Sequence, residues 1–298
     1  MMKSRMFIAR TQRGFTLVEA IIVMVLTGIL AGTMMLFLRQ PVQNYVDAAA
    51  RADLSDTADL ALRRMARELR GALPNSIRAL FVNGVWYVQF IPVKAGGQYL
   101  AVEDGAANGI PLDFVGGGDK FNVVGPMPAG AAIIPGTDSI VIYNLGNEIA
   151  GADAYAQTNL AVIKAVNNTP LGWEITLNNN PYAVGPSGAP NASPEHRFSV
   201  VTRPVTFRCE GRADGQGTLV RIVEGGFTAV QLPSTITPAT PRLAANVLAC
   251  NFSVDQAANV NAGMVGMSLA LARPRTGGAA NGLETVTLVH QIHVDNTP

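Results

Sequence analysis

The stretch Gly14-Phe15-Thr16-Leu17-Val18-Glu19-Ala20, followed by Ile21 to Leu38 without a charged side chain, decides the fold of this chain. From Phe15 to Leu38 the sequence has 24 residues and one ionisable group, Glu19. As a helix this segment is about 36 Å long, which is enough to cross a hydrocarbon core of about 30 Å. The sequence therefore predicts a membrane-spanning helix over residues 15–38.

Residues 1–14 form a basic leader in front of this helix. They contain Lys3, Arg5, Arg10 and Arg13 and no acidic residue. An ordinary secretory signal has a shorter apolar core and a small-residue cleavage site after it, and no such site precedes Arg39. The positive-inside rule keeps the basic leader in the cytoplasm. We therefore expect a single pass through the inner membrane, with the rest of the chain in the periplasm.

Removal of the leader changes the charge balance. The whole sequence carries 22 basic and 21 acidic side chains, and residues 15–298 carry 18 basic against 21 acidic, a net charge of −3. A chain without an overall basic field does not attract nucleic acid through its net charge. We therefore predict no nucleic-acid partner.

Glu19 is the unusual residue of the apolar segment. A carboxylate in a membrane helix costs up to about 2.5–3.5 kcal/mol, and less near the interface. In one interpretation Glu19 lies at the cytoplasmic end and reaches water. In the other, cleavage after Gly14 creates an α-amino group on Phe15. That cation pairs with Glu19 of its own chain or of a neighbour in a filament.

The run from Arg13 to Glu19, followed by an uninterrupted apolar helix, resembles the N-terminal signature of type IV prepilins and type II secretion pseudopilins. The resemblance implies that a prepilin peptidase cleaves after Gly14 and N-methylates Phe15. Glu19 then matches the acid at the fifth mature position, which acts in docking and assembly. The implied partners are other minor and major pilins and an inner-membrane assembly platform. The resemblance also implies that the mature chain ends in the pilus, outside the cell.

Gly28 and Gly32 form a G-x-x-x-G pattern in the apolar helix. Such a pair permits close helix–helix approach in membranes, although glycine is also commoner in membrane helices than in soluble ones. Each glycine weakens a helix by about 1 kcal/mol, so this segment could also unwind during filament packing.

A second helical pattern covers residues 42–72, after a kink or restart expected at Pro41. One apolar stripe recurs at spacings of three and four: Leu54, Ala58, Ala61, Met65, Leu69 and Ala72. Asp59–Arg63 and Arg64–Glu68 are acid-to-base pairs four residues apart, so we interpret the Arg63–Arg70 cluster as a solvated face. Gly71 and Pro74 end the helix, giving an N-terminal helical region over residues 15–73.

Two further stretches narrow the resemblance. They run from Pro41-Val42-Gln43 through the arginine cluster to Ser76, and from His290 to Asn296. Both are similar to the large minor pilins of the mannose-sensitive haemagglutinin (MSHA) pilus system. This implies a minor subunit of pilus biogenesis.

Residues 74–298 have strand-like rather than helical periodicity. Short apolar runs alternate with turn-rich segments, and Asn83-Gly84 is a strong hairpin signal. The expected strands are Ile77–Val82, Val85–Ile91, Ser139–Tyr143, Leu160–Lys164, Trp173–Leu177, Arg197–Thr202, Val205–Cys209, Leu219–Val223, Val247–Val254, Met264–Leu271 and Glu284–Val294. We predict an α+β, pilin-like fold. Its long helix would pack on one edge of an antiparallel β-rich head of one or two units.

The two cysteines, Cys209 and Cys250, form an even pair in an exported chain, which favours one disulfide over two buried thiols. We expect Val205–Cys209 and Val247–Val254 to lie side by side, which would bring the cysteines together. The bond would close a loop of about 41 residues and add about 3–4 kcal/mol.

The sequence offers no constellation for catalysis, a metal or a cofactor. His290 and His293 are three residues apart in a strand pattern, which places them on opposite faces. The motifs C-x-x-C, H-E-x-x-H and G-x-S-x-G are absent from the sequence. We interpret one glycine-rich run as a turn, because it lacks the spacing of a P-loop: Gly116-Gly117-Gly118-Asp119-Lys120.

We therefore expect a structural protein rather than an enzyme. The leading hypothesis is a minor type IV pilin that primes assembly and lies at the filament tip, because a head of this size is bulky to repeat along a filament. A minor pseudopilin of a type II secretion system and a tip adhesin that binds surfaces or glycans are the alternatives.

Overall fold

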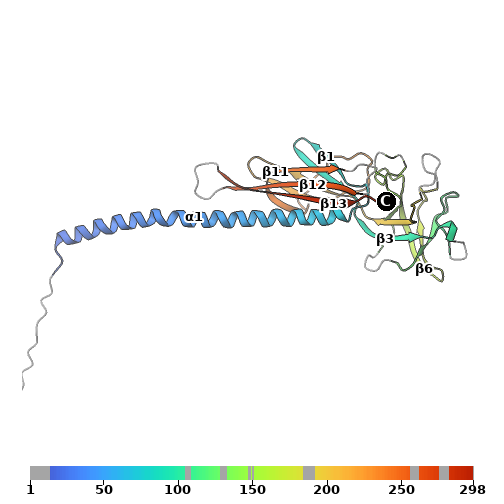
Figure 1. The fold of residues 1–298 in the computed structure, drawn as a ribbon, viewed down its shortest axis with the longest axis horizontal. Coiled ribbons are helices and arrows are strands. Elements are labelled where there is room, and N and C mark those ends of the chain that lie inside the picture. Colours follow the sequence, from blue (N-terminus) through green and yellow to red (C-terminus); the bar gives the residue numbers. More distant parts are fainter. Residues whose placement is uncertain are drawn as a thin grey trace, which may run out of the picture.

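The computed structural model describes residues 14–104, 109–127, 133–146, 149, 151–183, 192–255, 262–274 and 282–297. One long helix carries a head made of a seven-stranded sheet and a closed barrel (Figure 1). The predicted leader lies outside the described residues, except for Gly14. The α+β, pilin-like fold class predicted from the sequence is confirmed.

Helix α1 (Leu17–Arg70) is one continuous element of 54 residues. Its C-cap is Gly71, whose N–H donates to the carbonyls of Glu68 and Leu69. Pro41 lies inside the helix, so of the kink or restart expected at this residue, the restart is wrong. A proline removes one hydrogen bond to the preceding turn. The helix nevertheless continues and follows a gentle curve (Figure 1).

The C-terminal part of α1 packs on the head through its apolar stripe. All six predicted stripe residues are buried, and Leu62 and Ala66 are buried beside them. They share one core with the inward side chains of the sheet, including Phe90, Phe207 and Leu269. The helix contacts the last three strands of the chain, and the final one is an edge strand of the sheet, so the helix lies at one edge of the sheet, as expected.

The sheet is antiparallel throughout, in the spatial order β1-β2-β9-β10-β11-β12-β13. Its strands are β1 (Arg78–Val82), β2 (Val85–Phe90), β9 (Val205–Glu210), β10 (Gly217–Val223), β11 (Arg242–Asp255), β12 (Ala262–Pro274) and β13 (Leu283–Asp295). The predicted hairpin between β1 and β2 is present. Asn83 and Gly84 both have positive φ, at 51° and 78°, as a tight two-residue hairpin turn requires.

A disulfide joins Cys209 of β9 to Cys250 of β11, with the two Cα atoms 6.5 Å apart. The sequence predicted that these two strands lie side by side. That prediction is wrong, because β10 lies between them. Strand β10 begins only at Gly217, where it pairs with Val247, so β11 continues past the start of β10 to reach Cys250. The bond therefore links the two strands that flank β10 in the sheet.

The second unit is a closed barrel in the order β3-β4-β7-β6-β5-β8. Its strands are β3 (Val93–Tyr99), β4 (Lys120–Val124), β5 (Ser139–Val141), β6 (Leu160–Thr169), β7 (Gly172–Leu177) and β8 (Arg197–Val201), with a single turn of 3₁₀ helix, η1 (Val102–Asp104), after β3. The barrel has its own core, which includes Phe121, Ile140 and Tyr182. The head thus consists of two units, a question that the sequence left open.

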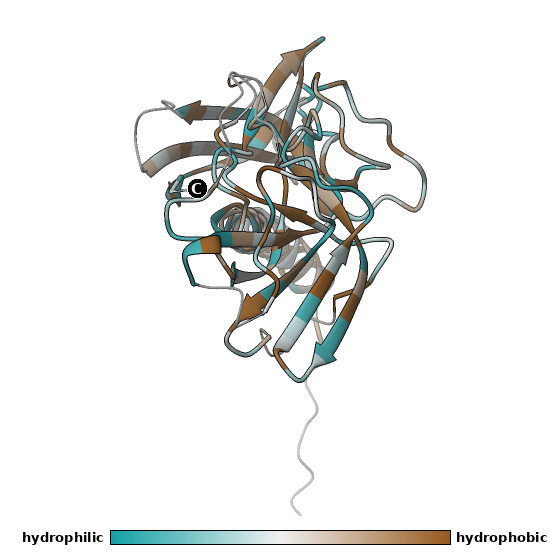
Figure 2. Ribbon diagram, turned by 90° about the vertical axis from the view of Figure 1, so that its right-hand side faces the viewer, coloured by the Kyte–Doolittle hydropathy of each residue, from teal (hydrophilic) through white to brown (hydrophobic). Residues whose placement is uncertain are grey.

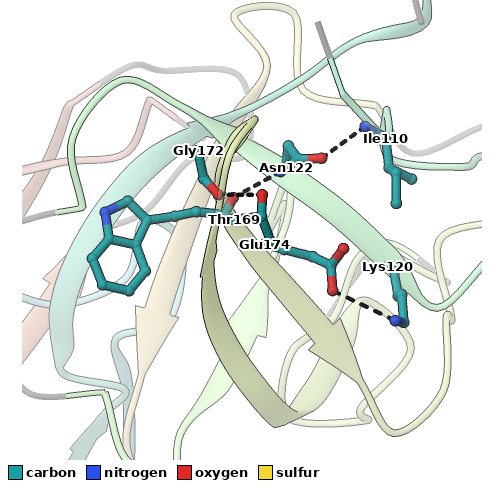
Figure 3. Close-up of polar contacts among 7 residues, drawn as sticks. Ile110, Lys120, Asn122, Thr169, Gly172 and Glu174 are labelled. Atoms are coloured by element: carbon teal, nitrogen blue, oxygen red, sulfur yellow. Dashed lines mark hydrogen bonds and ion pairs between the residues drawn. The ribbon is translucent and has the colours of Figure 1, made fainter.

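Polar contacts hold strand β4, which the sequence did not predict, in the barrel wall (Figure 3). The Asn122 side chain accepts from the Ile110 N–H at 2.7 Å and donates to the Trp173 carbonyl at 3.3 Å. Lys120 and Glu174 form an ion pair at 3.5 Å across β4 and β7. These bonds stabilise a strand of only five residues.

The two units meet at a junction centred on Arg78 and Tyr155. The Arg78 guanidinium lies 3.5 Å from the centroid of the Tyr155 ring and donates to the Gln89 side chain at 2.6 and 2.8 Å. The Tyr155 hydroxyl donates to the Ser76 carbonyl at 2.8 Å, and burial raises the pKa of this phenol. The junction fixes the barrel beyond the C-terminal end of α1 (Figure 1).

Candidate assembly site at the N-terminus of the helix

The predicted cleavage site lies in an exposed segment just before α1. Residues Gly14, Phe15 and Thr16 precede the helix and are exposed, and 78% of the Phe15 surface is accessible. No described atom approaches within 4 Å of the position that a Cβ on Gly14 would occupy. A peptidase can therefore reach the Gly14–Phe15 bond without unwinding the helix.

Thr16 is the N-cap of α1, with extended backbone at φ −80° and ψ 148°. Its hydroxyl accepts a hydrogen bond from the Glu19 N–H at 3.3 Å. Thr16 and Glu19 stand in the S/T-x-x-E spacing of a capping box. The sequence analysis missed this role of Thr16, although the spacing was visible in the printed sequence. The cap sets the first residue of the helix immediately after the cleavage site.

Glu19 lies in the first turn of the helix, where the macrodipole is positive. Cleavage after Gly14 would add the α-amino cation of Phe15 at this same positive end. A carboxylate in the first turn offsets both charges. Glu19 is thus placed where it can balance a mature N-terminus, in its own chain or in a neighbour.

The N-terminal part of α1 exposes an apolar surface on all sides. The stretch Leu17–Met35 has a mean hydropathy of 2.2 and is unburied. Its large exposed side chains are Leu17, Val18, Ile21, Ile22, Val23, Met24, Val25, Leu26, Ile29, Leu30, Met34 and Met35. A helix that is apolar all round belongs in a membrane or a protein core. This segment fits membrane anchoring.

The threonine hydroxyls inside this apolar segment form hydrogen bonds within the helix. The Thr27 hydroxyl donates to the Val23 carbonyl at 2.6 Å, and the Thr33 hydroxyl donates to the Leu30 carbonyl at 3.0 Å. Such bonds lower the cost of placing a hydroxyl in hydrocarbon. Gly28 and Gly32 have no described atom within 4 Å of a Cβ position, so this face of the helix is open to a second helix.

Comparison with known families gives a match over residues 9–35, to the model described as the prokaryotic N-terminal methylation motif. The chain carries a prokaryotic N-terminal methylation motif. The motif supports a subunit of the type IV pilin or pseudopilin type. It implies processing by prepilin peptidase and assembly with other pilin-type subunits. No curated protein and no solved structure shows significant similarity to the chain.

The arginine cluster on the packed part of α1 takes part in ion pairs. Arg63 pairs with Asp59 at 2.7 Å, and Arg64 pairs with Glu68 at 3.1 Å, as the spacing predicted. Glu68 also accepts from Arg221 of β10 at 2.7 Å, which links the helix to the sheet. The hydrogen bond that the Arg63 guanidinium donates to the Asp59 carboxylate raises the pKa of Arg63. Within this cluster, the Glu68–Arg221 pair is the contact that joins the helix to the sheet.

The histidines lie apart from one another. His290 is half-buried and His293 is exposed, on opposite faces of β13 as expected. His196, in the barrel, lies 3.5 Å from Glu103. Within the described residues, no group of three His, Cys, Asp or Glu side chains could hold a metal ion. The N-terminal segment is therefore the site that the described structure supports best.

Proposed function

We propose that this chain is a minor type IV pilin of the MSHA type, which helps to initiate pilus assembly and lies at the filament tip. It is held in the inner membrane by α1 with its head in the periplasm, and it then passes into the pilus. Prepilin peptidase, the other pilins and the inner-membrane assembly platform are its partners. The proposed role is structural and needs no catalytic residue or cofactor.

The placement of the barrel carries the proposal of a tip position. In a filament of parallel pilin helices, the apolar N-terminal ends point toward the cell and the heads point toward the tip. The barrel extends beyond the C-terminal end of α1, in the path of any subunit stacked above (Figure 1). In the view from the barrel end, the helix is seen end-on behind the head (Figure 2). A tip position accommodates this bulk because no subunit lies above it.

The test is a count of surface pili in a strain that lacks this gene. The strain is complemented with the wild-type gene, with Glu19→Ala, or with Asp56→Ala as a matched control. Asp56 is an exposed acid on the same helix, beyond the apolar segment. We expect a loss of at least about tenfold in pili for the deletion and for Glu19→Ala, which removes the carboxylate that balances the N-terminal cation. Asp56→Ala should restore the wild-type number.

A normal number of pili in the deletion strain would contradict the assembly role. A normal number with Glu19→Ala alone would show that docking does not depend on this carboxylate.

A pseudopilin of a type II secretion system is the second candidate, because the methylation motif is shared by pilins and pseudopilins. The same deletion strain separates the two. Loss of secreted enzymes from the medium with normal surface pili would favour the pseudopilin. Loss of pili with normal secretion would favour the pilin.

A further inference from the structure

The barrel is an insertion in a β-hairpin. Strands β2 and β9 are antiparallel neighbours, and their unbroken pairing ends with Phe90 opposite Val205. Every strand of the barrel lies between these two residues in the sequence. Antiparallel neighbours can be joined by a two-residue turn, as Val82 and Val85 are in the hairpin of β1 and β2. Residues 91–204 therefore stand where a short turn would complete the sheet.

Two connections join the barrel to the sheet, and they lie side by side. The chain enters the barrel through Ile91 and Pro92 and leaves it through residues 202–204. The Thr202 N–H donates to the Pro92 carbonyl at 3.3 Å, which holds the two connections together. Adjacent connections at one end of a module can act as a single hinge. The orientation of the barrel therefore depends on contacts outside these connections.

Each unit also has a core of its own. Among the described residues, the core of the helix and sheet and the core of the barrel have no member in common. The disulfide, the apolar stripe of α1 and the pairing of β2 with β9 all lie outside the barrel. A unit with its own core can fold alone. We therefore expect the helix and sheet to fold without the barrel.

A clamp, formed by Arg78 and residues 227–229, holds the barrel over the end of the helix. The Arg78 guanidinium lies against the Tyr155 ring of the barrel and donates to the carbonyls of Thr228 and Ala229, at 2.8 and 2.7 Å. Phe227, in the same β10–β11 connection, packs against a small core that contains residues of both units. The clamp thus ties a connection of the sheet to the barrel and opposes rotation about the hinge.

We propose that the barrel is an inserted stop, which ends the filament at this subunit because the clamp holds it over the C-terminal end of α1 (Figure 1). The helix and sheet form the assembly unit, and the barrel prevents a further subunit from stacking above it. This inference rests on the proposed pilin function. It goes further because it assigns the tip position to one removable module and to the clamp that orients it.

The first test removes the stop. In the barrel-less variant, residues 91–204 are replaced by Asn-Gly, the same pair that joins β1 to β2. The variant and the wild-type chain are each expressed in the strain that lacks this gene. Antibodies against the helix-and-sheet part then locate the chain on sheared pili by immunogold electron microscopy. We expect wild type at filament ends only, and at least about tenfold more labels per pilus, along the shaft, for the barrel-less variant.

The second test keeps the barrel and weakens the clamp. The clamp variant is Arg78→Ala/Phe227→Ala. Its matched control is Arg212→Ala/Phe81→Ala, which removes the same two residue types outside the clamp, where Arg212 pairs with Asp214 and Phe81 contacts Trp86.

Spin labels on two exposed positions, Leu60→Cys in α1 and Lys164→Cys in β6, measure the distance between helix and barrel. We expect a broader distance distribution and some labels along the shaft for the clamp variant, and wild-type behaviour for the control.

Thermal unfolding and the yield of the disulfide show whether each variant is folded. A barrel-less variant that does not fold, or that folds and stays at filament ends, would overturn the proposal. A clamp variant with an unchanged distance distribution, or with a broader one and labels at the ends alone, would overturn it as well. Wild type along the shaft would instead contradict the tip position itself, and the pilus count of the deletion strain reports separately on assembly.

Discussion

The two parts of helix α1 have the same secondary structure and opposite surroundings. Over Leu17–Met35 the helix is exposed, with apolar side chains on every face. From residue 51 to residue 70 most of its apolar side chains form one stripe, which is buried against the sheet. An apolar stripe can be buried against the sheet of the same chain. A helix that is apolar on all sides must be buried in a membrane or against other proteins.

This difference assigns separate roles to the two parts of the helix: the packed part stabilises the head, and the free part serves insertion and assembly. Changes in the packed part should act on the unfolding of the head, and changes in the free part should act on insertion and on contacts between subunits. Four residues at the border illustrate the transition. Arg51 pairs with the buried Glu284 of β13 at 2.9 Å, and Asp53 lies 3.9 Å from Arg273 of β12.

The largest expected effect on the packed part comes from removal of the disulfide. The double variant Cys209→Ala/Cys250→Ala opens a loop with a sequence separation of 41 residues, and we expect a loss of about 4 kcal/mol in the free energy of unfolding. Denaturant unfolding of the full chain, followed by tryptophan fluorescence, measures this loss. Wild type under reducing conditions is the control and should match the variant. An unchanged midpoint would mean that the bond contributes nothing to the packed part.

Three leucines of α1 test the comparison directly. Leu62 is 2% exposed, whereas Leu60 is 68% exposed in the same packed part and Leu30 is 66% exposed in the free part. We expect Leu62→Ala to lower the free energy of unfolding by about 3 kcal/mol, through lost burial and a cavity. Leu60→Ala and Leu30→Ala should leave it unchanged. Equal losses for all three would show that burial against the sheet does not distinguish the two parts.

The smallest effect is expected at the polar link between helix and sheet. Glu68→Gln weakens the bonds to Arg64 and Arg221, and we expect a loss of about 1 kcal/mol, because these side chains are only partly exposed. Asp59→Asn breaks the more exposed pair with Arg63 and should have no measurable effect. The same unfolding assay compares the two variants. A larger loss for Asp59→Asn would contradict the assignment of Glu68 as the link.

Local patterns predicted the parts of the fold that depend on local sequence. The helix stripe, the Asn83-Gly84 turn and every expected strand overlap the observed elements. Strands β3 and β4 were missed. Strand β3 contains Gly96 and Gly97, which are poor strand formers, and β4 is only five residues long. Both are held by pairing with distant strands and by contacts such as those of Asn122, which no local pattern reveals.

Arrangements between distant segments were harder to predict. The sequence placed β9 beside β11, but β10 lies between them, because strand order depends on pairings that no local pattern encodes. Closure of the barrel depends on the same kind of pairing. In the assembly site, Gly14, Phe15 and Glu19 could be proposed from a short contiguous motif. Thr16 was overlooked because the capping box overlaps that motif.

Mass spectrometry of the mature N-terminal peptide tests the central claim most directly. The chain is expressed in a host with an active prepilin peptidase and purified from its membranes. The account predicts a peptide that begins at Phe15 and carries one added methyl group on its α-amino nitrogen. A chain that still begins at Met1, or an unmethylated N-terminus at any other residue, would contradict it.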